Sequence, residues 1–267
     1  MSFNLYNLSD VEIYELLLNG RISSFPSGFW ANRTETEAKD TAIELLRYLI
    51  NVKLKLNKEE VEAIVSKKFL TKYKLHTASK LFGRSAIKYV ISSFPDTDYQ
   101  PWKFKKDKVP QCYWTNEENR LNAVRYLFDK EFKWSIEDVK EKLSWDLLEK
   151  NGLMTLHSYY TNLFELIKCI YPNKKLFPWE LKNSEVPNGT WSSKKNRIKA
   201  VKWLVKKSSL KGIQINRNTF GVYGLSRLLE EYYCDNPKRA INEAYGDSPI
   251  KGRHKSENMF IYHHGGS

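Results

Sequence analysis

The sequence lacks the marks of a membrane protein or a secreted protein. No apolar run approaches the ~20 residues that a membrane-spanning helix needs, and the first residues have neither the basic start nor the apolar stretch of a secretory signal. Cysteine is scarce: Cys112, Cys169 and Cys234 stand far apart, and no CxxC pair occurs. Few, scattered cysteines are typical of free thiols in a reducing compartment. We therefore expect a cytoplasmic protein that does not contact membranes.

Catalytic and cofactor motifs are missing as well. The chain has no P-loop, no zinc-protease motif, no nucleophile elbow and no dinucleotide-binding glycine motif. The five histidines lack the spacing of metal ligands, and His254, His263 and His264 fall near the end of the sequence. Neighbouring acids such as Glu59-Glu60 lie in helix-like contexts, where capping or solvation explains them better than acid–base catalysis. The sequence predicts a protein without catalysis, cofactor or metal.

Strand-like alternation of apolar and polar residues is scarce, and helical spacing takes its place. Thr34 and Glu37 match a capping box, and apolar residues then recur at Ala42, Leu45 and Leu49. We expect further helix starts at Asn57, Thr115 and Ser135. The predicted fold class is all-α.

The helical segments recur with a fixed period. Phe94-Pro95 is followed by Pro101-Trp102, and the equivalent pairs Tyr171-Pro172 and Pro178-Trp179 return 77 residues later. The segment 119–127 reappears over 196–204 at the same offset. Such a period is typical of tandem modules, which form extended binding surfaces more often than a catalytic cleft.

The repeat predicts tandem helical modules of about 77 residues, with a truncated half-repeat that caps the array at its N-terminal end. We place the partial repeat at 1–30, module 1 at 31–110, module 2 at 111–185, a divergent basic module 3 at 186–250 and a flexible tail at 251–267. In the partial repeat, a helix over 11–18 should end at Asn19-Gly20. In module 3 we expect helices over 193–207, 220–233 and 237–245.

Tryptophans recur at fixed positions of the repeat. A large aromatic side chain in such a position either forms a binding platform or packs in the core, and the burial habits of aromatics favour the core. We therefore assign an architectural role to Trp30, Trp102, Trp114, Trp179 and Trp191.

The formal net charge of +13 is distributed unevenly. Residues 1–110 carry +5, residues 111–185 carry −1 and residues 186–267 carry +9. A basic balance of this size favours nucleic acid or another anionic partner. In module 3, no Asp or Glu occurs from Val186 to Leu229.

The basic residues of module 3 form the main candidate site. Lys194 and Lys195 open its first helix, where the helix dipole prefers acids, and the matching turns of modules 1 and 2 carry Glu37 and Glu117-Glu118. A phosphate would supply the missing negative charge, although a solvated basic face is the alternative. The candidate ligands are Lys194, Lys195, Arg197, Lys199, Lys202, Lys206, Lys207, Lys211 and Arg217.

A second acid-free cluster lies over residues 67–88 of module 1. Its interleaved aromatics, Phe69, Tyr73 and Phe82, suit base stacking beside backbone contacts, but they equally fit the inner faces of short helices. The candidate ligands are Lys67, Lys68, Lys72, Lys74, Lys80 and Arg84, with His76 and Lys88 beside them.

Residues 30–95 resemble the homing-endonuclease-associated repeat through a Trp-led start, a first helix and the element Leu81-Phe82-Gly83-Arg84-Ser85-Ala86. Residues 114–172 share the resemblance less clearly, because Tyr159-Tyr160-Thr161-Asn162 replaces the Phe-Gly element. The paired Pro-Trp element is not part of that family's pattern. Such repeats are tri-helical, helix-turn-helix-like DNA-binding modules, so the resemblance implies DNA binding without assigning base-contacting residues.

These observations lead to one expectation and one alternative. We expect a non-catalytic DNA-binding tandem-repeat protein, a regulator of transcription or accessory factor of a phage or mobile element, with duplex DNA as the favoured ligand. The sequence leaves the choice between DNA and RNA open. The alternative is a helical-repeat scaffold that binds an acidic protein partner. The sequence leaves the oligomeric state open.

Overall fold

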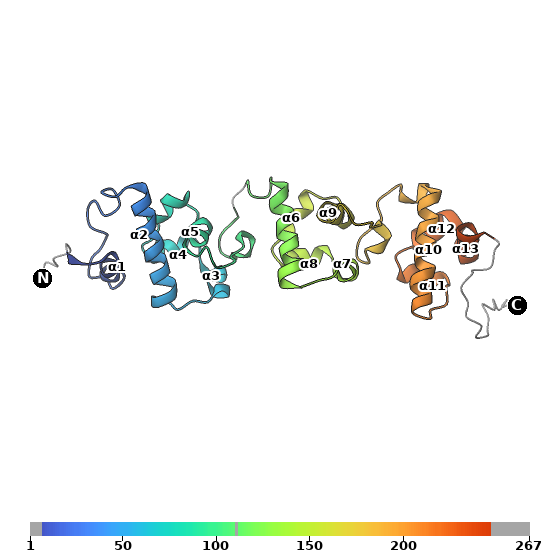
Figure 1. The fold of residues 1–267 in the computed structure, drawn as a ribbon, viewed down its shortest axis with the longest axis horizontal. Coiled ribbons are helices and arrows are strands. Elements are labelled where there is room, and N and C mark those ends of the chain that lie inside the picture. The colour runs from blue at the N-terminus through green and yellow to red at the C-terminus, as the bar shows by residue number, and fades with distance from the viewer. Residues whose placement is uncertain (1–6, 110–111, 247–267) are drawn as a thin grey trace. The chain divides into compact units, whose positions relative to one another are not determined.

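The described part of the chain is helical. The computed structural model describes residues 7–109 and 112–246, and these residues form thirteen α-helices with short 3₁₀ and π segments and no strand (Figure 1). The all-α prediction is therefore confirmed. The tail predicted over 251–267 lies outside the described residues.

The chain divides into two compact units. One unit is Met1–Ala123 with Lys150–Thr155, and the other is Val124–Glu149 with Leu156–Ser267. The first unit contains α1 (Asp10–Leu18), α2 (Glu35–Arg47), π segment η2 (Tyr48–Lys53), α3 (Lys58–Ile64), α4 (Lys67–Lys72), 3₁₀ segments η3 (Ala78–Phe82) and η4 (Pro101–Lys103), and α5 (Ala86–Ser93). The second contains π segment η5 (Leu127–Glu131), α7 (Ile136–Lys142), α9 (Leu163–Ile170), 3₁₀ segments η7 (Pro178–Glu180) and η8 (Thr190–Ser192), α10 (Lys194–Leu210), α11 (Arg217–Val222), α12 (Ser226–Tyr233) and α13 (Pro237–Tyr245). The division crosses α6 (Glu117–Tyr126), α8 (Trp145–Lys150) and η6 (Met154–Ser158), so it does not coincide with the sequence modules.

Most helix starts lie at the predicted caps. Thr34 accepts the Glu37 backbone N–H and donates its own N–H to the Glu37 carboxylate, and Asn57 caps α3 in the same reciprocal way. Ser135 caps α7. The helix start predicted at Thr115 is wrong, because the Glu118 N–H donates to the Asn116 side chain at 2.8 Å, while the Thr115 hydroxyl donates to the Cys112 carbonyl at 2.7 Å.

The first long helix of modules 1 and 2 ends in a π turn. Segment η2 continues α2 and η5 continues α6, and Lys55 and Lys133 then adopt left-handed backbone angles with φ of 53° and 52°. These turns lead directly into α3 and α7. In module 3 the equivalent helix, α10, stays regular to Leu210 without a π segment, and Gly212 with φ 65° then forms the left-handed turn.

A shared turn identifies equivalent helices in the three modules. The helices α4, α8 and α11 are followed by one residue with positive φ and then by a fully or largely buried leucine. These pairs are Lys74-Leu75, Gly152-Leu153 and Gly224-Leu225. The Leu75 N–H donates to the Leu70 carbonyl at 2.7 Å. The Leu225 N–H donates to the Phe220 carbonyl at the same distance.

This turn corrects the prediction for module 3. The helix expected over 220–233 is two helices, α11 and α12, separated by three residues around Gly224. The tandem repeat therefore extends into module 3 with α10, α11 and α13 in the places of α2, α4 and α5. Accordingly, α10 packs against α13 as α2 packs against α5.

The Pro-Trp elements form joints. After the first, the Lys105 N–H donates to the Glu62 carbonyl of α3 at 2.9 Å. After the second, the Lys182 N–H donates to the Lys140 carbonyl of α7 at 2.9 Å. The rings of Trp102 and Trp114 lie 6.2 Å apart, and those of Trp179 and Trp191 lie 5.5 Å apart. All four side chains are buried, which supports their architectural assignment, whereas Trp30 is half-buried.

Helix α1 belongs to the core of module 1. Its Ile13, Tyr14 and Leu17 join the buried cluster that α2 and α5 also line. The Tyr14 hydroxyl donates to the Tyr73 carbonyl at the end of α4, at 2.8 Å. The helix ends at Asn19-Gly20 as predicted, with Gly20 at φ 70°.

Candidate nucleic-acid interface

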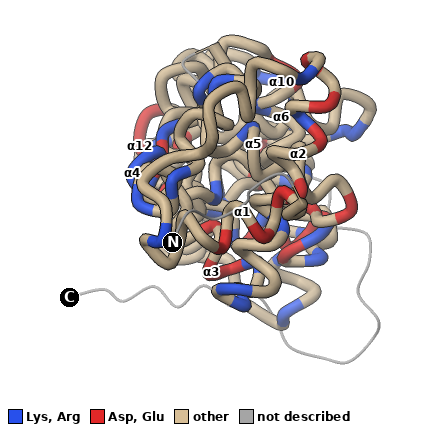
Figure 2. The backbone as a smooth tube through the Cα atoms, turned by 90° about the vertical axis from the view of Figure 1, so that its left-hand side faces the viewer, with Lys and Arg blue, Asp and Glu red and all other residues tan. Residues whose placement is uncertain are grey.

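Helix α4 presents a cationic face to solvent. Its cap Ser66 accepts the Phe69 N–H at 3.3 Å, and the Phe69 and Leu70 side chains are buried. At 100° per residue the opposite side of the helix carries Lys67, Lys68, Thr71 and Lys72, all exposed. The face therefore combines three cations with no acid. Figure 2 marks the basic residues along the backbone of α4 in blue.

The turns after α4 add further exposed cations. Lys74 occupies the left-handed turn with φ 61°, and burial of the following Leu75 fixes that turn. Lys80 is exposed on η3, and Arg84 is exposed with φ 57° just before α5. We call Lys67–Lys88 the module 1 cationic segment.

The cations of this segment are not neutralised by the described chain. Among the residues that the structure describes, no acid forms an ion pair with Lys67, Lys68, Lys72, Lys74, Lys80, Arg84 or Lys88. Lys72 lies over the Tyr73 ring at 5.1 Å, a contact that leaves its charge available.

The aromatics of the segment serve mainly as core. Phe69 and Phe82 are each 8% exposed, and the Phe82 ring stacks on Tyr89 with 4.5 Å between centroids. Tyr73 is half-buried against Phe69. The inner-face interpretation is therefore confirmed for Phe69 and Phe82, and the segment offers cations rather than a stacking platform.

The equivalent helices of the other modules carry different charges. Where α4 has Lys67, Lys68 and Lys72, α8 has Trp145, Asp146 and Lys150. The corresponding positions of α11 are Arg217, Asn218 and Val222. The cationic face is thus a property of module 1 and not of the repeat itself.

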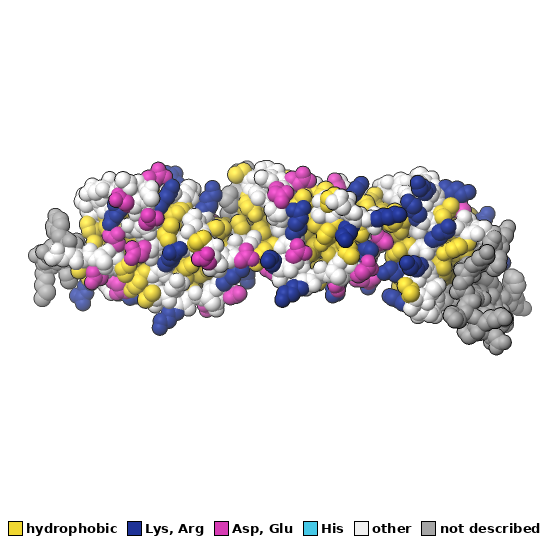
Figure 3. All heavy atoms as spheres, viewed as in Figure 1, with side chains coloured by type: hydrophobic (Ala, Val, Ile, Leu, Met, Phe, Trp, Pro, Cys, Tyr) yellow, Lys and Arg dark blue, Asp and Glu magenta, His cyan; other side chains and the backbone are white. Residues whose placement is uncertain are grey.

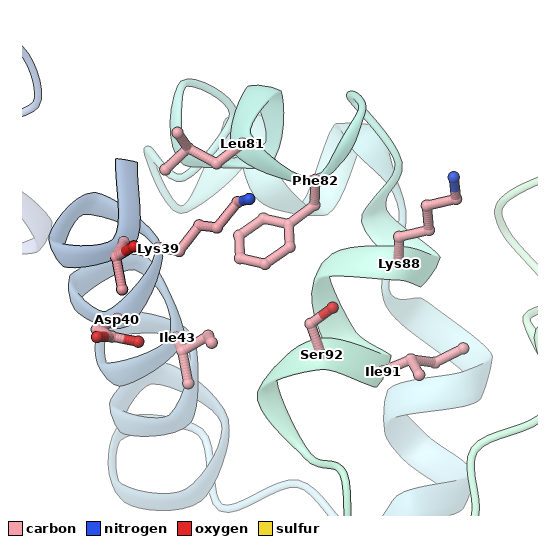
Figure 4. A pocket seen from close by; sticks show the side chains of 9 residues that line it. Lys39, Asp40, Ile43, Leu81, Phe82, Lys88, Ile91 and Ser92 are labelled. Carbon is pink, nitrogen blue, oxygen red and sulfur yellow. The ribbon is translucent and has the colours of Figure 1, made fainter. Parts of the chain in front are cut away.

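An open pocket of about 520 Å³ adjoins the segment between α2, η3 and α5 (Figure 4). Ile43, Phe82 and Ile91 give it an apolar lining, and Lys39 and Lys88 stand at its sides. Lys39 is paired with Glu35 at 2.6 Å. Within residues 7–109 and 112–246, no group of three His, Cys, Asp or Glu side chains is arranged to hold a metal ion.

In module 3 the structure places Arg197 in a structural role. Its guanidinium donates to the Trp191 carbonyl at 2.9 Å and pairs with Glu243 of α13 at 3.3 Å. Arg120 makes the equivalent bond to the Trp114 carbonyl in module 2, at 2.6 Å. Hydrogen bonding within the fold therefore occupies one of the predicted phosphate ligands.

The first turn of α10 is not without a nearby acid, so the prediction of uncompensated cations there is wrong. Although no acid lies nearby in sequence, the Glu243 carboxylate approaches the Lys194 ammonium at 3.9 Å and also accepts from Tyr233. Burial raises the pKa of Glu243, but the hydrogen bonds from Tyr233 and Arg197 and the nearby positive charges outweigh it, and the net pKa is lowered. Helix α13, which carries Glu243, supplies the missing charge from a distant part of the sequence.

The other predicted cations of module 3 have varied surroundings. Lys207 pairs with Glu137 at 3.3 Å and Arg217 with Asp235 at 3.0 Å. Lys199, Lys202 and Lys211 lie over the rings of Phe177, Tyr245 and Tyr223. Lys195 and Lys206 are exposed, and the described residues give them no acidic partner. On the face shown in Figure 3, basic side chains gather over α10 to α13 with apolar ones between them.

The fold and its internal repeat define a tandem helical-repeat protein, and none of its described helices is long and apolar enough to cross a membrane. The chain belongs to a family described as proteins of unknown function (DUF4046), whose model matches residues 11–99 and again residues 102–176. The two matches follow the tandem arrangement, and residues beyond 176 lie outside them. No curated protein and no solved structure matches the chain.

Proposed function

We propose that the chain is a non-catalytic nucleic-acid-binding protein of the cytoplasm, with duplex DNA as its preferred ligand. The module 1 cationic segment carries the proposal, because its cations are exposed and have no acidic partner in the described chain. Exposed cations without acidic partners contribute most to the free energy of phosphate binding, because binding releases condensed counterions and breaks no ion pair.

The arrangement of the segment favours a duplex backbone over single strands. Phosphate contacts need cations in fixed positions, and the buried Phe69 and Leu70 hold α4 in place beneath Lys67, Lys68 and Lys72. Binding of single strands relies on aromatic rings open to the bases, and Phe69 and Phe82 are packed in the core. The three-residue turn between α11 and α12 is of the kind that joins the helices of helix-turn-helix motifs.

In this proposal module 3 contributes a weaker second contact. Among the predicted ligands of module 3, the described residues give no acidic partner to Lys195, Lys199, Lys202, Lys206 and Lys211, whereas Lys194, Lys207 and Arg217 already approach acids. Separate contacts by linked modules would combine through effective concentration. A role in transcription regulation, as expected from the sequence, belongs to the same proposal.

Charge reversal at three positions tests the proposal. We expect Lys67→Glu, Lys68→Glu and Lys72→Glu together to lower the affinity for a pool of duplex DNA by at least about tenfold, measured by fluorescence anisotropy. At positions 67 and 68, in the first turn, an acid favours the helix, whereas at position 72, in the last turn, it is unfavourable; these effects offset one another, so α4 should remain folded. The matched control reverses the exposed Lys168, Lys174 and Lys175 of module 2, which changes the net charge equally.

Comparing the two triple variants distinguishes a binding site on α4 from an effect of the net charge alone. Equal losses in both triple variants would contradict a site on α4. Tighter binding of single-stranded DNA or of RNA than of the duplex would contradict the preferred ligand.

A further inference from the structure

The loop between α1 and α2 forms one wall of a pocket in module 1. Asn19-Gly20 ends α1, and the Phe29 N–H in the loop donates to the Pro26 carbonyl at 3.1 Å. The Arg33 guanidinium donates to the Phe29 carbonyl and pairs with Asp10 of α1 at 2.6 Å. These bonds fix the loop to α1, so the wall is formed before any ligand arrives.

Aromatic side chains give this wall its chemistry. The Phe25 and Phe29 rings stack with 4.4 Å between centroids, and they meet the Trp30 ring at angles of 73° and 82°. Phe25 and Trp30 are half-buried, and Phe29 is buried. Together with Leu17 and Pro26, these rings line a pocket of about 510 Å³. The wall is apolar, as in most sites that bind small organic groups.

The opposite wall belongs to the module 1 cationic segment. Lys74, His76 and Thr77 line the pocket from the turn after α4, and the first two are exposed. The buried Tyr14 of α1 contacts both walls. Its ring stacks on Phe25 with 6.0 Å between centroids, and its hydroxyl donates at 2.8 Å to the backbone carbonyl just before Lys74. The aromatic wall is thus held beside a lysine that has no acidic partner in the described chain.

The equivalent place in module 2 is closed by the backbone of the joint. Gly152 stands there at the position of Lys74, and a Cβ on Gly152 would lie 2.8 Å from the Trp102 carbonyl oxygen. A side chain at this position of module 2 would therefore collide with the joint. In module 1 the loop leaves room for Lys74 and for the pocket beside it. The lysine and the pocket thus occur together, as a departure of module 1 from module 2.

We propose that this pocket, the module 1 aromatic pocket, binds an unpaired nucleobase of the nucleic acid whose phosphates contact the module 1 cationic segment. The inference rests on the proposed function, because the segment must bring the nucleic acid to the pocket. The apolar wall suits a planar base, and the hydroxyls of Ser23, Ser24 and Thr77 in the lining suit its polar edge. Lys74 contacts the phosphate of the same nucleotide.

This site distinguishes a duplex with an unpaired base from a fully paired duplex. A paired base stays stacked in the duplex, and its removal costs unpairing and unstacking free energy. A mismatched base enters a pocket at a lower cost. The cations of the segment bind the backbone of both duplexes, whereas the pocket adds free energy of binding only for the unpaired base.

Two fluorescein-labelled duplexes of equal length test the proposal, one fully paired and one with a single mismatched adenine. We expect the original chain to bind the mismatched duplex at least about fivefold more tightly in anisotropy titrations. Ser24→Trp, at an exposed position of the lining, should remove this preference and leave the affinity for the paired duplex unchanged. The matched control Ser27→Trp places the same side chain at an exposed position outside the lining and should keep the preference.

A second variant removes part of the wall instead of filling the pocket. Trp30→Ala should also reduce the preference for the mismatched duplex, and circular dichroism establishes that the variant is folded. Equal binding of the two duplexes by the original chain would overturn the pocket alone, because the paired duplex would still be bound. Binding of neither duplex would overturn the proposed function and this inference with it.

Adenosine monophosphate distinguishes a base within a strand from a free nucleotide. It carries the same base and phosphate but makes none of the other backbone contacts, so it should bind far more weakly than the mismatched duplex. At high concentration it should compete for the pocket and remove the preference for the mismatched duplex. Tighter binding of adenosine monophosphate than of the mismatched duplex would identify a free nucleotide as the occupant and contradict the proposal.

Discussion

An Asn-Arg pair fixes the start of the first long helix in modules 2 and 3. The Asn119 side-chain amide donates to the Tyr113 carbonyl at 2.9 Å, and that of Asn196 donates to the Thr190 carbonyl at 3.1 Å. The arginine that follows, Arg120 or Arg197, donates to the tryptophan carbonyl. These side chains bind carbonyls of the preceding turn and so orient the tryptophan that closes the joint.

Replacing Arg197 should therefore destabilise the fold. Its side chain is 15% exposed and bonds both a carbonyl and Glu243, so we expect Arg197→Ala to lower the free energy of unfolding by about 2 kcal/mol. Urea unfolding followed by tryptophan fluorescence measures the effect. The neighbouring Lys195→Ala, at an exposed position, should change it by less than about 0.5 kcal/mol. Equal effects of the two substitutions would contradict the structural role of Arg197.

The pKa of Glu243 predicts a pH dependence of stability. Because its pKa is lowered in the folded protein, the carboxylate stabilises the fold above the unfolded pKa of about 4.3, and this contribution is lost as the pH falls through the folded pKa. We expect Glu243→Gln to unfold at lower urea concentration than the original chain at pH 7. The difference between their urea midpoints should become smaller as the pH falls below about 4. A difference that stays constant, or grows, would contradict a stabilising role of the Glu243 carboxylate.

At the scale of elements, one left-handed turn recurs with different residues. Lys74, Gly152 and Gly224 occupy it with φ of 61°, 80° and 70°. A side chain costs roughly 1–2 kcal/mol in this conformation, which glycine avoids. The surroundings also differ, because a Cβ at Gly152 would lie 2.8 Å from the Trp102 carbonyl oxygen, whereas a Cβ at Gly224 would meet nothing within 4 Å.

Because their surroundings differ, replacing Gly152 or Gly224 by alanine should have different costs. Gly224→Ala should cost about 1 kcal/mol of unfolding free energy from backbone strain alone. Gly152→Ala should cost more, about 2–4 kcal/mol, because the joint at Trp102 must also shift. Thermal and urea unfolding of both variants would measure the costs. A Gly152→Ala variant no less stable than Gly224→Ala would contradict the close approach at this joint.

Sequence patterns predicted the elements well where local signals decide structure. The caps at Thr34, Asn57 and Ser135 and the stop at Asn19-Gly20 all depend on residues a few positions apart. The joints are identifiable because their residues recur in the sequence 77 positions later. The break between α11 and α12 was missed, although Gly224 stands at the position of Gly152 and could have indicated it. The π turns have no comparable local signal.

The candidate site was less predictable because tertiary contacts decide it. The acid-free run of module 3 predicted uncompensated cations, but Glu243 of α13, Asp235 of the turn before it and Glu137 of α7 approach Lys194, Arg217 and Lys207. The cluster of module 1 has the same sequence pattern without such contacts. Counting charges along the chain therefore could not rank the two clusters, and the structure favours module 1.

At the scale of the whole molecule, modules 1 and 3 depart from the common repeat in different ways. Module 1 has the unneutralised cations of the segment Lys67–Lys88, whereas module 3 has no helix between α10 and α11 and several of its cations approach acids. The proposed function would arise from a local departure from the repeat rather than from the repeat itself.

The salt dependence of duplex DNA binding tests the central claim most directly. Anisotropy titrations of the original chain, the module 1 triple variant and the module 2 control triple variant at several salt concentrations give the slope of log affinity against log salt. We expect a negative slope for the original chain and a similar slope for the module 2 control. For the module 1 triple variant we expect a slope smaller in magnitude by up to about three, because each lost phosphate contact removes about 0.9 from the slope. An affinity independent of salt, or identical slopes for all three proteins, would contradict it.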